Sequence, residues 1–172
     1  EANMQNKSIV LDGQNVAFCH GKTKAKELKR KGFFSYDGLK ISAMTLYNNG
    51  YRAKIILPEF WCRRNKTERY DGAQEVIEYL REKELIIEVK GDEADQIDDV
   101  CALGYAHDNN LCLISNDRFK EQLKGLEQNL LEHWSTWINK NTIRFDFIGD
   151  TLFLNRKTLS IDYVDVATGV EI

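Results

Sequence analysis

The feature of this sequence that most constrains its fold is a set of short apolar runs, each of which stops at a polar residue. The four runs are Ile9–Leu11, Ile55–Leu57, Leu85–Val89 and Leu111–Ile114. The polar residues that follow them are, in the same order, Asp12, Pro58-Glu59, Lys90-Gly91 and Ser115-Asn116-Asp117. Because apolar residues follow one another in these runs without regular alternation, the runs predict strands that are buried on both faces.

Helical patterns separate these runs. Three stripes of apolar residues at helical spacing lie between them: Leu39, Ala43, Leu46 and Tyr47, then Ala73, Val76, Ile77 and Leu80, then Ile97, Val100, Cys101, Gly104 and Tyr105. Strands that alternate with helices predict an α/β fold, a three-layer α/β/α sandwich with a central, mainly parallel sheet. A fourth stripe over 130–138, followed by apolar residues on both sides of Gly149-Asp150, predicts another helix and a β-hairpin.

The length of 172 residues is that of one ordinary domain. We expect a single domain over 1–172, with a core over about 8–154 and a C-terminal tail over 155–172 that forms an edge strand or no regular structure. The chain opens at Glu1 and enters an apolar run almost at once, which indicates a piece of a longer protein. A homodimer and flanking domains therefore both stay open.

Cysteine usage and hydropathy bear on the compartment. The four cysteines show no C-x-x-C spacing, and no signal-like apolar segment precedes the first strand. We therefore expect free thiols and an intracellular location, cytoplasmic or nuclear. No apolar stretch approaches the roughly 20 residues of a membrane helix, so we expect no membrane partner.

Charge is unevenly distributed. A formal net charge of −3 argues against binding nucleic acid through the overall field. Two segments are nevertheless basic: one holds Lys22, Lys24, Lys26, Lys29, Arg30 and Lys31 against Glu27, and the other holds Arg63, Arg64, Lys66 and Arg69 against Glu68. We expect Lys22, Lys24, Lys26, Arg63 and Arg64 to contact the phosphates of RNA. The alternative for the first segment is a solvated loop that leaves the sheet.

Acidic residues stand where ligands bind in an open parallel sheet, at the carboxyl ends of its strands. Asp12 and Asp117 follow strand runs, and Asp98 and Asp99 open the third helical stripe. Carboxylates that converge repel one another unless a cation compensates them. Mg²⁺ or Mn²⁺ fits because hard divalent ions take oxygen ligands, and such an ion can activate water to attack a phosphodiester.

Each acid also has a structural interpretation. Asp95 can cap a helix with Asp98 at its third position, and Asp117 can cap a helix that begins at Arg118. Asp12 is harder to explain by capping, because it closes a buried strand before Gly13, although an Asx turn stays open. Their joint occurrence at strand ends favours the functional interpretation.

Three motifs resemble those of one family. Ile9 to Ala17, with His20-Gly21 after it, resembles the D-G-S-N-V-A motif of the regnase (MCPIP-type) NYN/PIN-like ribonucleases, a family of CCCH zinc-finger proteins. Asp98-Asp99 resembles the D-D pair of that family, and Ser115-Asn116-Asp117 resembles its S-N-D motif. The resemblance covers about residues 8–154.

The resemblance implies a PIN-like, Rossmannoid fold and an Mg²⁺- or Mn²⁺-dependent endoribonuclease that hydrolyses single-stranded RNA, in mRNA decay or RNA processing. Carried over by position, it implies a catalytic metal site with two supporting asparagines: Asp12, Asp98, Asp99 and Asp117, supported by Asn15 and Asn116. Three departures stand out: Gln14 replaces the usual Ser, the segment 91–97 is acidic and short where regnases carry a basic loop, and the zinc finger is absent.

Trp61 with Arg63 resembles the W-R pair of the family, and we expect Trp61 to stack on an RNA base. The alternative is that Trp61 covers an edge of the core.

Other functions fit less well. Phosphatases of the haloacid dehalogenase type would need a second Asp where Gln14 stands, and the glycine-rich nucleotide-binding motifs are absent. A non-catalytic NYN domain that binds RNA or acts as a scaffold is the main alternative. Such a domain would be expected to have lost at least one of the four acids, and none is lost.

Overall fold

The computed structural model describes residues 7–29, 31–90, 97–155, 164–165 and 170–171, with only the backbone described for 97–100 and for the pairs after 155. Its centre is a sheet of five parallel strands in the order β3-β2-β1-β4-β5. The strands are β1 (Lys7–Asp12), β2 (Tyr51–Pro58), β3 (Ile86–Val89), β4 (Leu113–Ile114) and β5 (Thr142–Ile143). The predicted parallel sheet is confirmed, and β1 lies in its middle.

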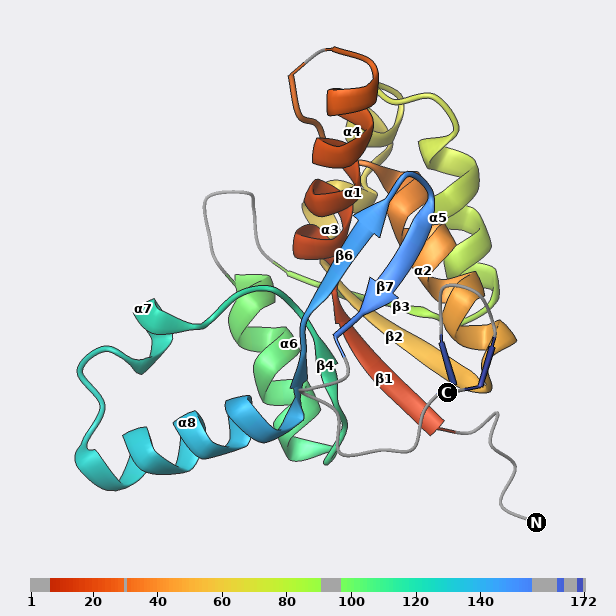
Figure 1. The fold of residues 1–172 in the computed structure, drawn as a ribbon. Helices are drawn as coiled ribbons and strands as arrows, with labels where there is room; N and C mark the ends of the chain where they lie inside the picture. Colours follow the sequence, from red (N-terminus) through yellow and green to blue (C-terminus); the bar gives the residue numbers. More distant parts are fainter. Residues whose placement is uncertain (1–6, 30, 91–96, 156–163, 166–169, 172) are drawn as a thin grey trace.

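Helices cover both faces of this sheet, which confirms the three-layer α/β/α sandwich (Figure 1). On one face lie α2 (Tyr36–Asn48) and α5 (Ala73–Glu82), and on the other lie α6 (Ile97–Asp108) and α8 (Gln128–Asn141). Short helices occupy three connections: α3 (Glu59–Cys62), α4 (Arg64–Thr67) and α7 (Lys120–Leu123).

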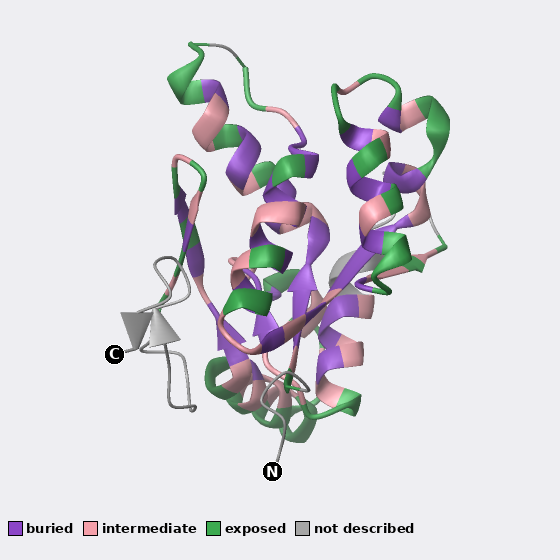
Figure 2. Ribbon diagram, turned by 90° about the vertical axis from the view of Figure 1, so that its right-hand side faces the viewer, coloured by how far each residue is buried: buried purple, intermediate pink, exposed green. Residues whose placement is uncertain are grey.

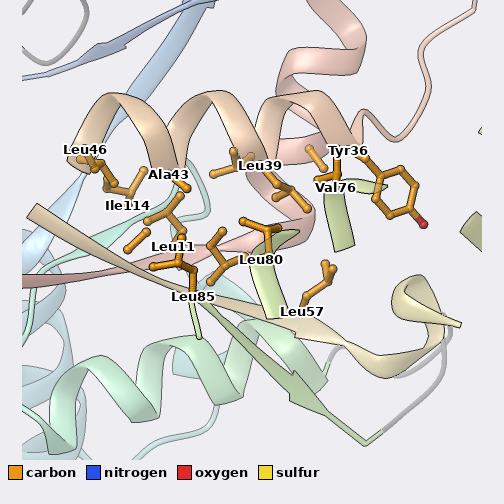
Figure 3. Packing of buried hydrophobic residues seen from close by; sticks show 14 of the residues in the cluster. Leu11, Tyr36, Leu39, Ala43, Leu46, Leu57, Val76, Leu80, Leu85 and Ile114 are labelled. Atoms are coloured by element: carbon orange, nitrogen blue, oxygen red, sulfur yellow. The ribbon is translucent and has the colours of Figure 1, made fainter. Parts of the chain in front are cut away.

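Alternate residues of each inner strand are buried on opposite faces, as the continuous apolar runs predicted. Leu11 packs with residues of α2 and α5, as Figure 3 shows for Leu39 and Leu80. Its neighbour Val10 instead belongs to the cluster that includes Ala102 of α6. Figure 2 shows the buried strands between the two helical layers.

Lys22, Lys24 and Lys26 of the first basic segment lie on a helix, so the alternative of a solvated loop does not hold for them. α1 (Gly13–Glu27) continues beyond the end of β1, whereas α2 runs back beside β2 (Figure 1). Several of the buried residues of α1 are small or polar, such as Ala17, His20 and Gly21. These residues produce only a weak apolar stripe, which explains why the sequence pattern did not predict the helix.

The end of the chain is partly as predicted. The hairpin of β6 (Phe145–Ile148) and β7 (Thr151–Leu154) is present, and β5 joins the sheet just before it. The proposed edge strand at Leu159, Ile161 and Tyr163 lies outside the described residues. After it, β8 (Val164–Asp165) and β9 (Val170–Glu171) pair antiparallel.

The four cysteines are free, as expected. Burial raises the pKa of the thiols of Cys19, Cys62 and Cys112. Within the described residues, no helix has both the length and the apolar character needed to span a membrane.

Candidate active site

Asp12 is the last residue of β1, and none of its surface is exposed to solvent. Its Oδ2 accepts a hydrogen bond from Ser115 Oγ at 2.9 Å, and its Oδ1 accepts one from the backbone N–H of Asn15 at 3.5 Å. The second bond makes Asp12 the N-cap of α1. Our expectation that Asp12 is hard to explain by capping is therefore wrong, but its complete burial goes beyond what a cap requires.

Gly13 allows α1 to begin against the sheet. A Cβ atom on residue 13 would lie 2.5 Å from the carbonyl oxygen of Ile56 in β2. The glycine is therefore needed for a close approach of backbones.

The loop after β4 lies beside Asp12 because β4 pairs with β1, with Ile114 opposite Leu11. Ser115 Oγ accepts a hydrogen bond from the backbone N–H of Asp117 at 3.1 Å, while it donates to Asp12. One serine hydroxyl thus connects the two acids. The half-buried Asp117 accepts a bond from the backbone N–H of Phe119 at 2.8 Å, which forms an Asx turn. No helix begins at Arg118, so the predicted cap there is wrong.

The two asparagines hold this loop. Asn15 Oδ1 accepts a hydrogen bond from the backbone N–H of Asn116 at 2.8 Å. The Asn116 side chain in turn exchanges two bonds with the backbone of Phe145, at 2.9 and 3.0 Å. Together they connect the start of α1, the loop after β4 and the start of β6.

Arg144 is a residue of this region that the sequence did not single out. Its Nη1 donates to the carbonyl oxygens of Asn116 and Asp117. Burial, with the neighbouring Arg118, lowers the pKa of Arg144. A cation directly before the first hairpin strand was the available signal, but only the fold shows that it lies against the loop after β4.

Asp98 and Asp99 are in the first turn of α6 by their backbone, and their side chains lie outside the described part of the chain. Among the described side chains, no three from Asp, Glu, His and Cys form a group that could hold a metal ion. Of the four acids, the two whose side chains are described lie at the carboxyl ends of adjacent strands: Asp12 ends β1, and Asp117 lies in the loop after β4. Both offer carboxylate oxygens. This donor chemistry fits a hard divalent cation.

Trp61 belongs to the core and is only 2% exposed. Its ring stacks on Phe34, with centroids 3.9 Å apart and planes 7° apart. Its Nε1 donates to Gln14 Oε1 at 3.0 Å, so the residue that replaces the usual Ser holds this ring. The expectation that Trp61 stacks on a base is wrong in this conformation, and its alternative role at the core is correct.

The predicted RNA-binding cations differ in their partners. Arg63 pairs with Glu59 at 3.0 Å and Arg64 with Glu68 at 2.8 Å, and both side chains are exposed. Lys24 pairs with Glu27 and with Asp150 of the hairpin turn, at 3.2 and 3.3 Å. Lys22 and Lys26 are exposed on α1. Their contact with RNA stays a prediction.

His20 joins α1 to two distant segments. The ring is 1% exposed, with Nδ1 2.6 Å from Ser35 Oγ and Nε2 2.9 Å from Asp150 Oδ1. The hydrogen bonds from His20 and Lys24 lower the pKa of the Asp150 carboxyl. Gly21 allows the same closeness, because a Cβ there would lie 1.6 Å from the carbonyl oxygen of Phe33. The His-Gly pair of the motif therefore holds the hairpin and the start of α2 against α1.

The sequence model of the Zc3h12a-like ribonuclease NYN domain family matches residues 5–162. The chain belongs to this family. The match confirms the resemblance inferred from the three motifs, and it makes the chain a member of a family of ribonuclease domains. The acids of this NYN domain lie in motifs within the matched residues.

Two solved structures of the nuclear protein-only RNase P 2 (PRORP2) of Arabidopsis thaliana share the fold of this NYN domain. Their TM-scores are 0.59 and 0.61, at 17% and 18% sequence identity. Each match covers 87% of this chain but 29% of the PRORP2 chain. The NYN domain therefore spans less than a third of the length of these proteins, and the likeness shows a shared fold.

Proposed function

We propose that this NYN domain is a metal-dependent endoribonuclease that hydrolyses phosphodiester bonds in single-stranded RNA. The observation that carries the proposal is the burial of Asp12 at the end of the central strand, hydrogen-bonded to the serine that also holds the loop of Asp117. Burying a negatively charged carboxylate at the end of a strand costs free energy unless partners compensate its charge. A divalent cation supplies such compensation.

In this proposal four acids hold Mg²⁺ or Mn²⁺: Asp12, Asp98, Asp99 and Asp117. When bound, the ion activates a water molecule and stabilises the leaving oxygen. Asn15 and Asn116 keep the acids in place, and the lysines of α1, with Arg63 and Arg64, contact RNA phosphates. Residues 1–172 would then act as one domain, inside the cell, in mRNA decay or RNA processing.

A circular, labelled single-stranded RNA tests the proposal, because only an endonuclease can open a circle. We expect linear products with Mg²⁺ or Mn²⁺ and none with EDTA. Zn²⁺ should not replace them, since the four acids offer neither thiolate nor imidazole. A fully paired RNA of the same composition is the control for single-strand preference and should stay intact.

Undiminished cleavage in EDTA would contradict the metal mechanism. RNA binding without cleavage in any of these ions would favour the non-catalytic alternative, in which the domain binds RNA or acts as a scaffold. Binding is therefore measured in parallel, by fluorescence anisotropy of the same RNA in linear form.

A further inference from the structure

A cavity of about 650 Å³ lies beyond the acids, where the second half of α1 meets the segment before α2 and the turn between α4 and α5. Its volume is in the range of pockets that hold small molecules, roughly 300–1,000 Å³. His20, Lys24 and Leu28 line one wall at positions i, i+4 and i+8 of the chain, along one side of α1. The family motifs do not include most of its lining, and neither Asp12 nor Asp117 is part of it.

Two cations of this cavity form no ion pair among the described residues. Lys31 and Arg69 are exposed and line the cavity, and neither forms an ion pair with another described residue. Arg63 and Arg64 of the same basic stretch as Arg69 are paired with glutamates. In this stretch Arg69, and not Arg63 or Arg64, is therefore the arginine that lines the cavity without an ion pair.

Aromatic rings form another part of the lining. Phe33 and Tyr70 are partly exposed there, and the buried residues Phe34 and Tyr36 also line the cavity. The rings of Tyr36 and Tyr70 lie 5.5 Å apart, and those of Phe34 and Tyr36 lie 4.7 Å apart. Partly exposed rings beside free cations are the combination that holds single-stranded nucleic acid, by base stacking and phosphate contact.

Two acids, Asp37 and Asp71, also line the cavity. They offset the charges of Lys31 and Arg69, so the lining is unsuited to a polyphosphate. Carboxylates instead accept hydrogen bonds from the amino groups of bases. The ligand that fits the whole lining is one nucleotide with a single phosphate.

We propose that this cavity is a subsite for one flanking nucleotide of single-stranded RNA, with its base against Phe33 and Tyr70 and its phosphate on Lys31 and Arg69. The inference rests on the proposed function, because the RNA must also reach Asp12. Leu28, at the far end of the wall that α1 contributes, is 16 positions along the chain from Asp12 and so lies roughly 24 Å away, which corresponds to about seven stacked nucleotides. RNA long enough to reach both places binds more tightly than RNA that covers only the acids.

The test measures binding of labelled oligonucleotides of four and twelve residues to the Asp12→Asn protein, so that no cleavage interferes. Arg69→Ala and Tyr70→Ala should each weaken binding of the twelve-residue RNA about fivefold or more. A fivefold loss of affinity is the smallest effect expected when one base–aromatic contact is removed. Binding of the four-residue RNA should not change. Arg69→Ala should also reduce the salt dependence of long-RNA binding by about one unit of slope.

Matched controls are available at the other end of the fold. Lys83→Ala removes an exposed cation at the end of α5, and Tyr47→Ala removes an exposed ring at the end of α2. Both should bind the two RNAs as the parent does. Thermal melts of every variant confirm that the fold is retained.

A twelve-residue RNA without bases separates stacking from charge. It should bind the parent more weakly than the normal RNA does, and Tyr70→Ala should not weaken it further. Equal binding by cavity and control variants would overturn the subsite, as would equal affinity of the parent for short and long RNA. A protein that binds long RNA through Arg69 and Tyr70 but cuts nothing would instead contradict the proposed chemistry and leave the subsite standing.

Discussion

Ser115 donates a hydrogen bond from its Oγ to Oδ2 of Asp12 over 2.9 Å, although 103 positions separate the two residues in the chain. The same hydroxyl accepts the backbone N–H of Asp117. The Ser115 hydroxyl therefore connects Asp12, a proposed metal ligand, to the loop that carries Asp117, a second proposed ligand. Removing either end of the Ser115–Asp12 bond has different expected effects.

Asp12→Asn removes the charge and keeps the shape. The amide oxygen can still accept from Asn15, and the amide nitrogen can donate to Ser115 Oγ, so the fold should survive. Cleavage of single-stranded RNA should fall by more than about 100-fold, the scale for loss of one preorganised electrostatic group. Asp146→Asn, an exposed hairpin position, is the control and should cleave as wild type does. Full activity in a folded Asp12→Asn protein would mean that the site lies elsewhere.

Ser115→Ala keeps the charge and removes its partner. We expect the free energy of unfolding to fall by about 1–3 kcal/mol, because a buried carboxylate loses a donor. The Mg²⁺ concentration for half-maximal cleavage should rise about 10- to 100-fold, as for other residues that orient metal ligands. Urea unfolding and metal titrations measure the two effects.

The control for Ser115→Ala is Ser42→Ala, since Ser42 is also fully buried and donates to Gly38 O at 2.8 Å within α2. It should lose about 1 kcal/mol of stability without any change in the Mg²⁺ requirement. A matching loss of stability by both variants, with no separate effect on metal, would assign Ser115 a purely structural role.

The sign of the stability change on neutralising Asp98 or Asp99 distinguishes helix capping from metal binding. If they only complement the dipole of α6, Asp98→Asn and Asp99→Asn should each cost roughly 0.3–1 kcal/mol of stability and leave cleavage intact. If they belong to a repulsive acid cluster, stability in EDTA should be maintained or raised while cleavage falls. We expect the second outcome, with the larger loss of cleavage for Asp99→Asn. Thermal melts in EDTA beside cleavage assays in Mg²⁺ distinguish them.

Asp150 should give the fold a pH-dependent contribution. Its folded-state pKa is lowered, first by His20 and then by Lys24. A lowered pKa stabilises the fold above the unfolded value of about 3.9, and this contribution is lost as the pH falls through the folded pKa. Asp150→Asn should thus be less stable at pH 7, by about 1 kcal/mol or less because the carboxylate is largely exposed. Urea unfolding between pH 2 and 7 should show this gap closing in acid; a constant gap would contradict the assignment.

The sequence predicted those parts of the fold in which apolar residues form a continuous run or recur at helical spacing. The strands around Val10 and Leu113 and the helices α2 and α5 bury such residues, so their positions follow from pattern alone. The closeness of Asp12 and Asp117 follows as well, because parallel strands end at one edge.

The sequence did not predict features that depend on polar or very small residues. In α1 the buried side holds His20 and Gly21, whose places are set by Ser35, Phe33 and Asp150 rather than by hydrophobicity. Trp61 was misassigned for a related reason: beside arginines it has the composition of an RNA-binding segment, whereas its burial depends on Phe34.

The order of strands in the sheet determines when during synthesis the proposed site can be complete. β1, the first strand made, lies between β2 and β4, and His20 contacts a residue 130 positions later. A nascent chain that ends before β4 leaves one side of β1 unpaired and lacks both Ser115 and Asp117. Contacts of such long sequence separation form late in folding. An unfinished chain on the ribosome therefore lacks part of the proposed set of metal-binding acids.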